Sequence, residues 1–303
     1  MKKLVGWLIV LLVGIFLGLT AGWFVSRWQA PDYSYYTTAF EYSEPAPDAE
    51  TIRLDSQVLG EERVINVSLP ASYGANEDQA YPVLYMPDGG LGEDFPHMVY
   101  SVRQLEGTNE LPEMIIVGIE NTLRQRDLTG PTNVAEDLEI AELVGQSENF
   151  RKFIAGELKP EIEKRYRCNQ QDAVIGESLA GLFVVETALQ DSDLFDHYMA
   201  ISPSLWWNDD GLVKEAGQLL QTIDTPHRLF LCSANETDIY PQTGKLAEVF
   251  SERPSKFQWV YEPRMDLTHQ TIFRAMKKKA LTWTLRPWLE NGAANPALPN
   301  ASP

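Results

Sequence analysis

Ser178 is the residue whose surroundings point most directly to chemistry. It stands in the segment Asp172-Ala-Val-Ile-Gly-Glu-Ser-Leu-Ala-Gly181, where a short apolar run ends and a helical pattern begins at Leu179. A strand, a sharp turn and a helix would push the serine Oγ out above a sheet, beside the backbone N–H groups of the helix N-terminus. A hydrolase needs such a protruding nucleophile next to donors that can hold a developing oxyanion.

The motif around this serine departs from a strict Gly-x-Ser-x-Gly pattern. Gly176 is present, but Ala180 takes the fifth position and Gly181 follows one residue later. Small residues are required where strand and helix backbones pass closely, and alanine adds one methyl group, so we expect a tight turn that still forms. Because Gly-x-Ser-x-small also occurs by chance, the rest of the sequence must support the assignment.

An acid and a histidine follow the serine in the chain, each after an apolar run typical of a strand. Glu236 and Asp238 follow the first of these runs, and His269 follows the second. The order Ser178, acid, histidine is that of α/β-hydrolases, and parallel strands would bring all three to the same sheet edge. Glu236 is the expected acid, with Asp238 as the alternative.

Loops after other predicted strands carry further candidates. The loop Pro87-Asp-Gly-Gly-Leu-Gly92 could supply the second half of an oxyanion hole, or be only a tight turn. Arg124 and Arg126 follow another strand and could hold a substrate carboxylate or phenolate, although Arg126 could instead pair with Asp127. The remaining pair, Trp206 and Trp207, could line an acyl or aromatic pocket, or simply cover the edge of the sheet.

The elements that must position these residues follow an α/β pattern. Solidly apolar runs alternate with stretches of helical period, which indicates a mostly parallel central sheet with helices on both faces. Besides the strand and helix that flank Ser178, the predicted strands are 51–59 and 63–69 (a hairpin), 81–86, 114–119, 197–201, 228–233 and 257–261. The predicted helices are 95–106, 150–166 with a kink or break at Pro160, 212–222, 243–251 and 270–289.

Composition restricts the possible partners. The chain has 303 residues, of which 44% are hydrophobic, enough for one large domain. Its formal net charge of −18 argues against nucleic acid as a partner. We find no Cys/His cluster with zinc-ligand spacing and no glycine-rich phosphate loop, so we expect neither a metal nor a cofactor.

The N-terminus has the pattern of a membrane segment. Two lysines precede an uncharged, mostly apolar run from Leu4 to Val25, long enough to cross about 30 Å of hydrocarbon as a helix. The lysines outweigh Arg27 beyond the run, which favours a cytoplasmic N-terminus and a translocated remainder. We expect an uncleaved signal anchor (transmembrane helix), with a cleaved signal peptide and a secreted domain as the alternative. The expected organisation is anchor 1–30, tether 31–50, catalytic domain 51–290 and disordered tail 291–303.

Several motifs in the right order resemble the putative-esterase branch of the α/β-hydrolases, the group of siderophore esterases, esterase D-like enzymes and mycobacterial mycolyltransferases. The resemblance covers roughly residues 50–288. It rests on Tyr81-Pro-Val-Leu-Tyr-Met-Pro-Asp-Gly, Val117-Gly-Ile-Glu-Asn-Thr-Leu-Arg-Gln-Arg-Asp-Leu-Thr129, the segment around Ser178, Ala200-Ile-Ser-Pro-Ser-Leu-Trp-Trp207 and Thr268-His269.

The resemblance implies an α/β-hydrolase fold and a role for each site residue. Ser178 would be the nucleophile, His269 the base and Glu236 the acid, and the backbone N–H groups of Gly90 and Leu179 would form the oxyanion hole. Ala180 is the departure, because the family usually has glycine there.

These observations predict a serine carboxylic-ester hydrolase that works through an acyl-enzyme. We expect the catalytic domain to face the periplasm or the cell exterior and to act on a small-molecule or lipid-like ester. Two alternatives remain open: an acyltransferase of the same fold, and a non-catalytic relative that binds a ligand or an envelope partner.

Overall fold

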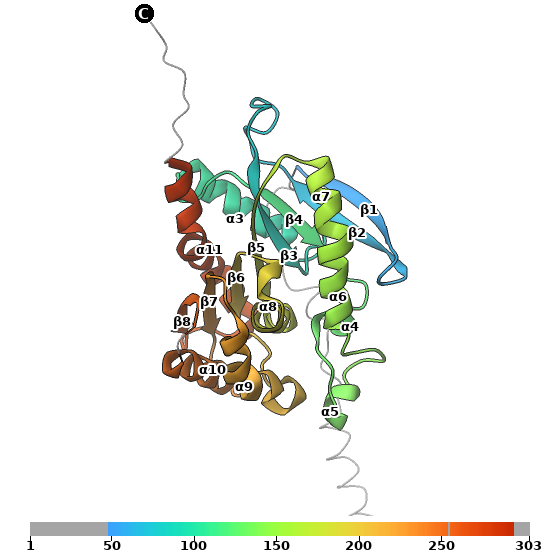
Figure 1. Ribbon diagram of the computed structural model, residues 1–303, viewed down its shortest axis with the longest axis vertical. Coiled ribbons are helices and arrows are strands. Elements are labelled where there is room, and N and C mark those ends of the chain that lie inside the picture. Colours follow the sequence, from blue (N-terminus) through green and yellow to red (C-terminus); the bar gives the residue numbers. More distant parts are fainter. Residues whose placement is uncertain (1–47, 254, 294–303) are drawn as a thin grey trace, which may run out of the picture. The chain divides into compact units, whose positions relative to one another are not determined.

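Eight strands form one mixed sheet in the computed structural model, which describes residues 48–253 and 255–293. Their order across the sheet is β1-β2-β4-β3-β5-β6-β7-β8 (Figure 1). The first two strands pair antiparallel as the predicted hairpin, β2 pairs antiparallel with β4, and all remaining pairs are parallel. The strands are β1 (Glu50–Ser56), β2 (Glu61–Ser68), β3 (Tyr81–Pro87), β4 (Ile115–Ile119), β5 (Cys168–Glu177), β6 (His197–Ile201), β7 (His227–Ser233) and β8 (Phe257–Pro263).

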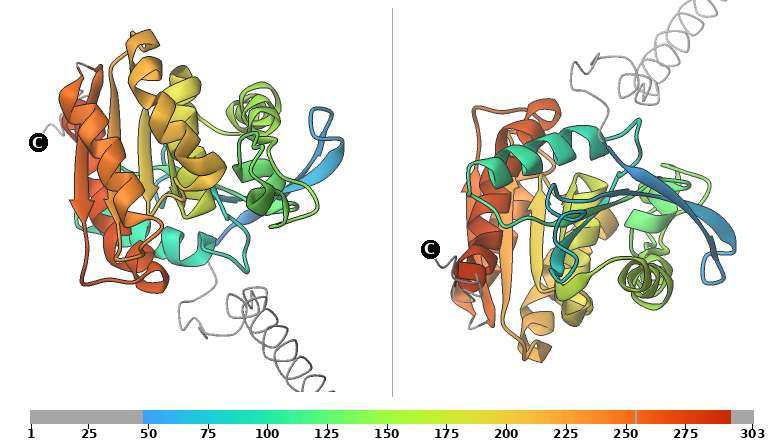
Figure 2. Two further views of the ribbon diagram at one scale, coloured as in Figure 1. Left: turned by 90° about the horizontal axis from the view of Figure 1, so that it is seen from below. Right: turned by 90° about the horizontal axis from the view of Figure 1, so that it is seen from above.

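Helices cover both faces of this sheet (Figure 2). On one face lie α3 (Phe95–Gly107) and α11 (His269–Ala293). The opposite face is covered by α6 (Ser147–Phe153), η1 (Ile154–Leu158), α7 (Lys159–Arg165), α8 (Leu179–Gln190), α9 (Trp207–Leu219) and α10 (Tyr240–Glu252). The short helices α4 (Arg124–Leu128) and α5 (Ala135–Leu138) follow β4. This is the α/β-hydrolase arrangement expected from the sequence.

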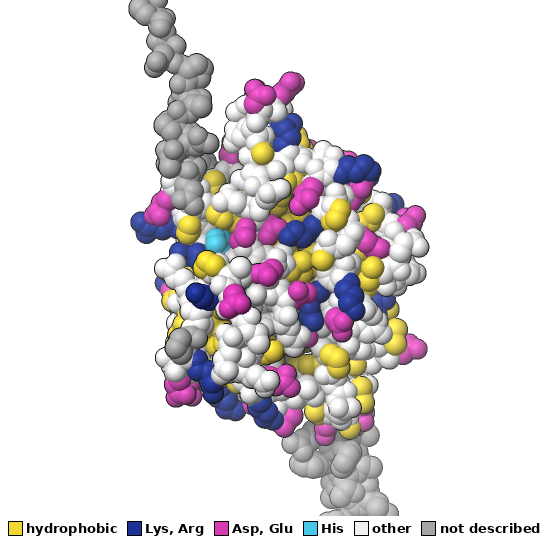
Figure 3. Space-filling model, viewed as in Figure 1, with side chains coloured by type: hydrophobic (Ala, Val, Ile, Leu, Met, Phe, Trp, Pro, Cys, Tyr) yellow, Lys and Arg dark blue, Asp and Glu magenta, His cyan; other side chains and the backbone are white. Residues whose placement is uncertain are grey.

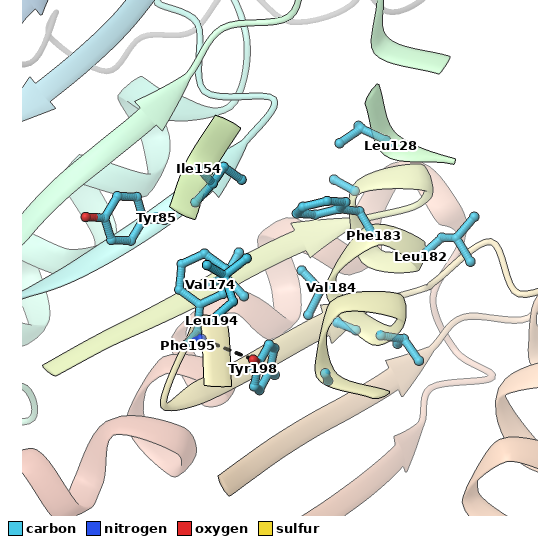
Figure 4. Close-up of a cluster of buried hydrophobic side chains, with 14 of the residues drawn as sticks. Tyr85, Leu128, Ile154, Val174, Leu182, Phe183, Val184, Leu194, Phe195 and Tyr198 are labelled. Carbon is cyan, nitrogen blue, oxygen red and sulfur yellow. Dashed lines mark hydrogen bonds between the residues drawn. The ribbon is translucent and has the colours of Figure 1, made fainter. Parts of the chain in front are cut away.

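The central strands are apolar on both sides because both faces of the sheet are covered. Every residue of β3 and β4 is buried, as the solid apolar runs predicted. Figure 4 shows part of the core on the α8 face, where Phe183 of α8, Val174 of β5 and Phe195 belong to one cluster of buried side chains. The backbone N–H of Phe195 donates a hydrogen bond of 3.2 Å to the Tyr198 hydroxyl. Even this buried polar group is therefore satisfied.

The helix predicted across Pro160 is continuous rather than broken. A π-helical stretch, η1, joins α6 to α7, and Pro160 falls within the first turn of α7. A wider turn just before a proline relieves the clash between its ring and the preceding carbonyl groups. The segment thus keeps its direction across the sheet.

Helix α9 begins irregularly, which explains why the sequence predicted its start at residue 212. Asn208, Asp209 and Asp210 adopt left-handed backbone angles with φ between 53° and 58°, and regular helix follows them. These short polar residues tolerate that conformation better than most others do.

The predicted anchor, residues 1–30, lies outside the described residues, as does most of the predicted tether. Within 48–253 and 255–293, no helix combines the length and apolarity needed to cross a bilayer. The last helix continues to Ala293, slightly into the range predicted as a disordered tail.

Candidate active site

Ser178 sits at the apex of the turn between β5 and α8, as predicted. Its backbone angles are φ 60° and ψ −121°, a region that a residue with a side chain rarely adopts. Three backbone hydrogen bonds fix this geometry: Ser178 N–H donates to Ile201 O (3.1 Å), while Ser178 O accepts from Leu182 N–H (2.9 Å) and Ser204 N–H (3.0 Å). A half-buried serine is therefore held firmly in a strained turn.

The strand and the helix approach so closely at this turn that Gly176 is required. A Cβ at position 176 would lie 2.5 Å from Ala180 O and 2.8 Å from Ala180 Cβ. Ala180, which replaces the usual glycine, is fully buried. Its methyl group fits because Gly176 has no side chain. The turn forms with alanine in place of the second glycine.

Backbone strain recurs along this edge of the sheet. Asp88, Ser178 and Ser202 follow the carboxyl ends of β3, β5 and β6, and their φ angles are 56°, 60° and 41°. Strained residues of this kind cluster at functional sites, where the surrounding structure over-determines them. Three adjacent strand ends therefore mark the same region as a candidate site.

Hydrogen bonds join the loops that carry the acid and the histidine. Asn235 N–H donates to Leu267 O (3.3 Å), and Arg264 N–H donates to Ser233 O (2.8 Å). The loop after β7 therefore lies against the loop after β8. Since β5, β6, β7 and β8 are parallel neighbours, the segments that contain Ser178, Glu236 and His269 share one edge of the sheet.

His269 and Glu236 each carry a buried polar atom that is unsatisfied among the described residues. These atoms are Nδ1 of His269 and Oε2 of Glu236. Burial lowers the pKa of His269, and the negative charge of Glu236 opposes that shift more than the charge of Asp238 does. Glu236 is half-buried and Asp238 is exposed. Of the two candidate acids, Glu236 therefore acts more strongly on the charge of His269.

The hydrogen bonds of a complete triad are not formed in this structure. Within the described residues, the hydrogen-bond partner of Ser178 Oγ is Ser204 Oγ at 3.3 Å, not His269. In proteins without substrate, catalytic hydrogen bonds are often long or misaligned and tighten only when substrate binds. The three residues share a sheet edge without yet being bonded to one another.

The two N–H groups predicted for the oxyanion hole differ in their environment. Leu179 is the first residue of α8, so its N–H has no acceptor within the helix. Gly90 N–H, by contrast, donates a hydrogen bond of 2.6 Å to Glu93 Oε2. The preceding glycine explains the sharp course of this loop, because a Cβ at Gly89 would lie 2.3 Å from Gly118 Cα of β4.

The arginines considered for substrate binding all pair with acids. Arg126 is buried and bonds Asp127 (2.7 Å) and Glu61 (2.6 and 3.0 Å), so the structure favours the ion-pair alternative over a pocket role. Arg124 makes a bidentate contact with Asp88 at 2.7 and 2.8 Å. A third arginine in these loops, Arg264, donates two hydrogen bonds to Asp266, at 2.8 and 2.6 Å. Acidic and basic side chains are likewise interspersed over the face shown in Figure 3.

The two tryptophans considered for the pocket have different positions. Trp207 is 4% exposed and donates from Nε1 to Gly130 O (2.7 Å), so it belongs to the core and a pocket role for it is not supported. Trp206 is half-buried, and its ring lies 5.9 Å from that of Trp207. Only Trp206 keeps a partly accessible surface for a substrate.

Sequence reasoning missed three polar residues at this edge. Ser204 contacts Ser178 directly, and Glu93 accepts a hydrogen bond from Gly90 N–H. Burial, followed by the negative charges of Asp94 and Asp88, raises the pKa of Glu177 well above its ordinary range. Ser204 lies in the segment Ile201-Ser-Pro-Ser204 after a strand, a position that could have identified it; Glu93 and Glu177 carry no comparable sequence signal.

No group of three or more His, Cys, Asp or Glu residues suited to a metal ion occurs in the part of the chain that the structure describes. Ser178, His269 and Glu236 bring a hydroxyl, an imidazole and a carboxylate to one edge of the sheet. This is the donor set of acyl transfer by a serine nucleophile.

Comparison with known proteins agrees with this geometry. The family described as "Putative esterase" matches residues 56–284. Ferri-bacillibactin esterase BesA of Bacillus subtilis is 34% identical over 151 residues, 45% of this chain and 52% of that protein. A siderophore triacetylfusarinine C esterase of Aspergillus fumigatus is 26% identical over 196 residues, 60% of this chain and 65% of that protein. These alignments thus span between about half and two thirds of the relatives' lengths.

Solved structures share the fold. An IroE-like serine hydrolase from Shewanella oneidensis superposes with a TM-score of 0.69 and 26% identity, covering 80% of this chain and 81% of that one. The BES protein from Bacillus cereus gives a TM-score of 0.71 at 22% identity, covering 82% and 99%. With three quarters of its sequence matched, the chain belongs to the "Putative esterase" family of the α/β-hydrolases.

Proposed function

We propose that this protein hydrolyses carboxylic esters through an acyl-enzyme formed on Ser178. The observation that carries the proposal is the backbone of Ser178, a serine held at φ 60° between a strand and a helix. Glycine would adopt these angles without strain, so a purely structural turn has no need of a serine. A nucleophile that must project beside a helix N-terminus does need one.

In the proposed reaction, Ser178 Oγ attacks the ester carbonyl carbon while His269 takes the hydroxyl proton. Glu236 orients the imidazole and stabilises its protonated form. The same proton passes to the leaving alcohol, and water then releases the acid from the serine by the reverse sequence. Leu179 N–H and Gly90 N–H would hold the carbonyl oxygen as it gains negative charge.

The environment of His269 suits a base at neutral pH. Because burial lowers its pKa, the imidazole is neutral and can accept a proton. A hydrogen bond from His269 Nδ1 to Glu236 Oε2 would satisfy two buried polar atoms at once, which favours a closed triad when substrate excludes water.

The substrate class we infer is the ester bond of a siderophore. Two relatives are described as siderophore esterases, one for ferri-bacillibactin and one for triacetylfusarinine C. An apolar substrate is further supported by six exposed large apolar side chains in segments that follow strand carboxyl ends. They are Leu91, Leu123, Leu138, Leu143, Tyr240 and Met265. Since the nearby arginines are paired with acids, we expect neutral or mono-anionic esters with apolar or aromatic acyl groups to be preferred over highly charged ones.

The decisive experiment is active-site labelling with a fluorophosphonate, combined with an ester panel. Wild-type protein should be labelled on Ser178, and Ser178→Ala should abolish both labelling and hydrolysis of short p-nitrophenyl esters. Ser204→Ala is the matched control, because it removes the neighbouring hydroxyl and should leave Ser178 reactive. Labelling on another residue, or unchanged hydrolysis by Ser178→Ala, would show the assignment to be wrong.

We further propose that the domain works outside the cytoplasm, held by residues 1–30 as a membrane anchor. The support is the apolar run from Leu4 to Val25 with its preceding lysines. A reporter that is active only outside the cytoplasm, fused after Pro303, should be active, and the protein should stay in the membrane fraction after a high-salt wash. A soluble product that lacks this segment would indicate cleavage, whereas a cytoplasmic reporter signal would contradict the proposal.

A further inference from the structure

Gly90 N–H, one of the two proposed oxyanion donors, is already occupied by a side chain of the protein. Glu93 Oε2 accepts its hydrogen bond at 2.6 Å, which is short for an N–H donor and typical of a charge-assisted bond. The turn closes on itself, because Glu93 N–H also donates to Gly90 O at 3.0 Å. A carboxylate of the protein therefore already accepts the hydrogen bond that Gly90 N–H would donate to a substrate.

The carboxylate is held from its other side as well. Asn121 Nδ2 donates to Glu93 Oε1 (2.8 Å) and to Asp88 Oδ1 (2.6 Å). Arg124 in turn makes its bidentate contact with Asp88. Glu93 is thus fixed by the loop after β4 in addition to its own turn, and it does not simply point into solvent.

We propose that Glu93 is an internal occupant of the oxyanion site, which must leave Gly90 N–H before the carbonyl oxygen of an ester can bind there. This inference rests on the proposed function, since it assumes that Gly90 N–H stabilises the oxyanion. Two negatively charged oxygens cannot share one N–H donor without strong repulsion. With Glu93 in place, the hole has only Leu179 N–H to offer.

The surroundings allow the carboxylate to leave. Leu91, inside the same turn, is 49% exposed. At Gly92, a Cβ would meet no atom within 4 Å. The outer part of the turn, Leu91 and Gly92, can therefore shift without breaking core contacts, and a substrate that covers the exposed apolar rim would gain contact with Leu91 as Glu93 moves away.

A bracing role for Glu93 makes the opposite prediction. If the carboxylate only stabilises the loop in its active shape, removing it should lower the rate. If it competes with the substrate oxygen, removing it should raise the rate, because a charge-assisted hydrogen bond no longer has to be broken. The direction of the change therefore separates the two roles.

The test uses the full chain and its Glu93→Ala and Glu93→Gln variants. We expect Glu93→Ala to raise kcat/KM for p-nitrophenyl acetate, and the second-order rate of fluorophosphonate labelling, by about tenfold. Glu93→Gln should give a smaller rise, since a neutral amide still accepts from Gly90 N–H but repels an oxyanion less. Glu120→Gln is the matched control, because its side chain lies beside Gly90 without bonding to its N–H.

The pH profile supplies a readout that a bracing role would not produce. The advantage of Glu93→Ala should be greatest where Glu93 is ionised and should shrink as pH falls and the carboxylate becomes protonated. Burial, and then the charge of Asp88, raise the pKa of Glu93 above its ordinary value of 4.5, which brings this change towards an accessible range. Other charged groups around the turn are Asp94, Glu120, Arg124 and Glu177.

The labelling and hydrolysis rates of these variants test the role of Glu93 separately from the role of Ser178. A rise for Glu93→Ala that Glu120→Gln does not reproduce supports the inference. Equal labelling rates in wild type and Glu93→Ala, a fall in rate, or the same rise in Glu120→Gln would overturn it while leaving Ser178 as the nucleophile. If Ser178 is not labelled in any variant, the proposed function itself fails.

Discussion

Replacing Ser178 by glycine should stabilise the protein while removing its activity. The native angles, φ 60° and ψ −121°, cost about 1–3 kcal/mol for a residue with a Cβ. Because three backbone hydrogen bonds hold Ser178 in place, the turn cannot relax to avoid this cost. Glycine adopts such angles freely but loses about 0.5–1 kcal/mol more backbone entropy on folding. The expected gain is therefore about 0.5–2 kcal/mol relative to alanine at the same position.

Ser178→Ala is the proper reference for this measurement. Both variants lose the Oγ and its contact with Ser204, so their difference reports the backbone strain minus the extra backbone entropy that glycine loses on folding. For a domain of this size, each kcal/mol corresponds to about 2–4 °C in Tm, so glycine should melt roughly 1–8 °C above alanine. Thermal and urea unfolding of the two inactive variants would measure it. A glycine variant less stable than the alanine variant would refute the strain at Ser178, and with it the main support for a nucleophile at this turn.

Three further outcomes follow from the same geometry. Gly176→Ala should lower kcat for short esters by about 10²-fold, because the added Cβ displaces α8 and the serine with it; an unchanged kcat would contradict the close approach. Glu236→Gln should reduce kcat more than Asp238→Asn does, and the reverse order would reassign the acid. The kcat/KM for ester hydrolysis should fall at acidic pH with a midpoint below 6.5, the ordinary pKa of histidine. The reason is that the neutral form of His269 is the active one and burial lowers its pKa. A midpoint above 6.5 would be inconsistent with a buried base.

The fold could be predicted closely from the sequence because its signals are local and consistent. Strands buried on both sides appear as unbroken apolar runs, and β3 and β4 coincide with the predicted runs to within a residue. The sequence left a kink or a break open at Pro160; the break does not occur, because a π turn that no local sequence signal indicates accommodates the proline. A helix boundary that depends on an irregular backbone leaves no signal in the hydrophobic periodicity of the sequence.

The candidate site was less predictable because its details depend on contacts between distant segments. The strand–turn–helix pattern located Ser178, and the order of loops located Glu236 and His269 at the same edge. The pairing of Arg126 with Glu61, 65 residues earlier in the chain, could not be foreseen from either segment alone. The burial of Trp207 beside a half-buried Trp206 depends in the same way on Gly130.

The buried core and the candidate active site occupy different parts of the strands in this domain. The middle of the sheet is fully buried, whereas three of the residues with positive φ, Asp88, Ser178 and Ser202, follow strand carboxyl ends. Strain of a few kcal/mol can persist there only because the rigid sheet over-determines the adjoining backbone. The turn that carries Glu93 follows the carboxyl end of β3 and is exposed at Leu91 and Gly92. If the oxyanion site must open before reaction, that turn is where binding energy from the rest of the ester would be used.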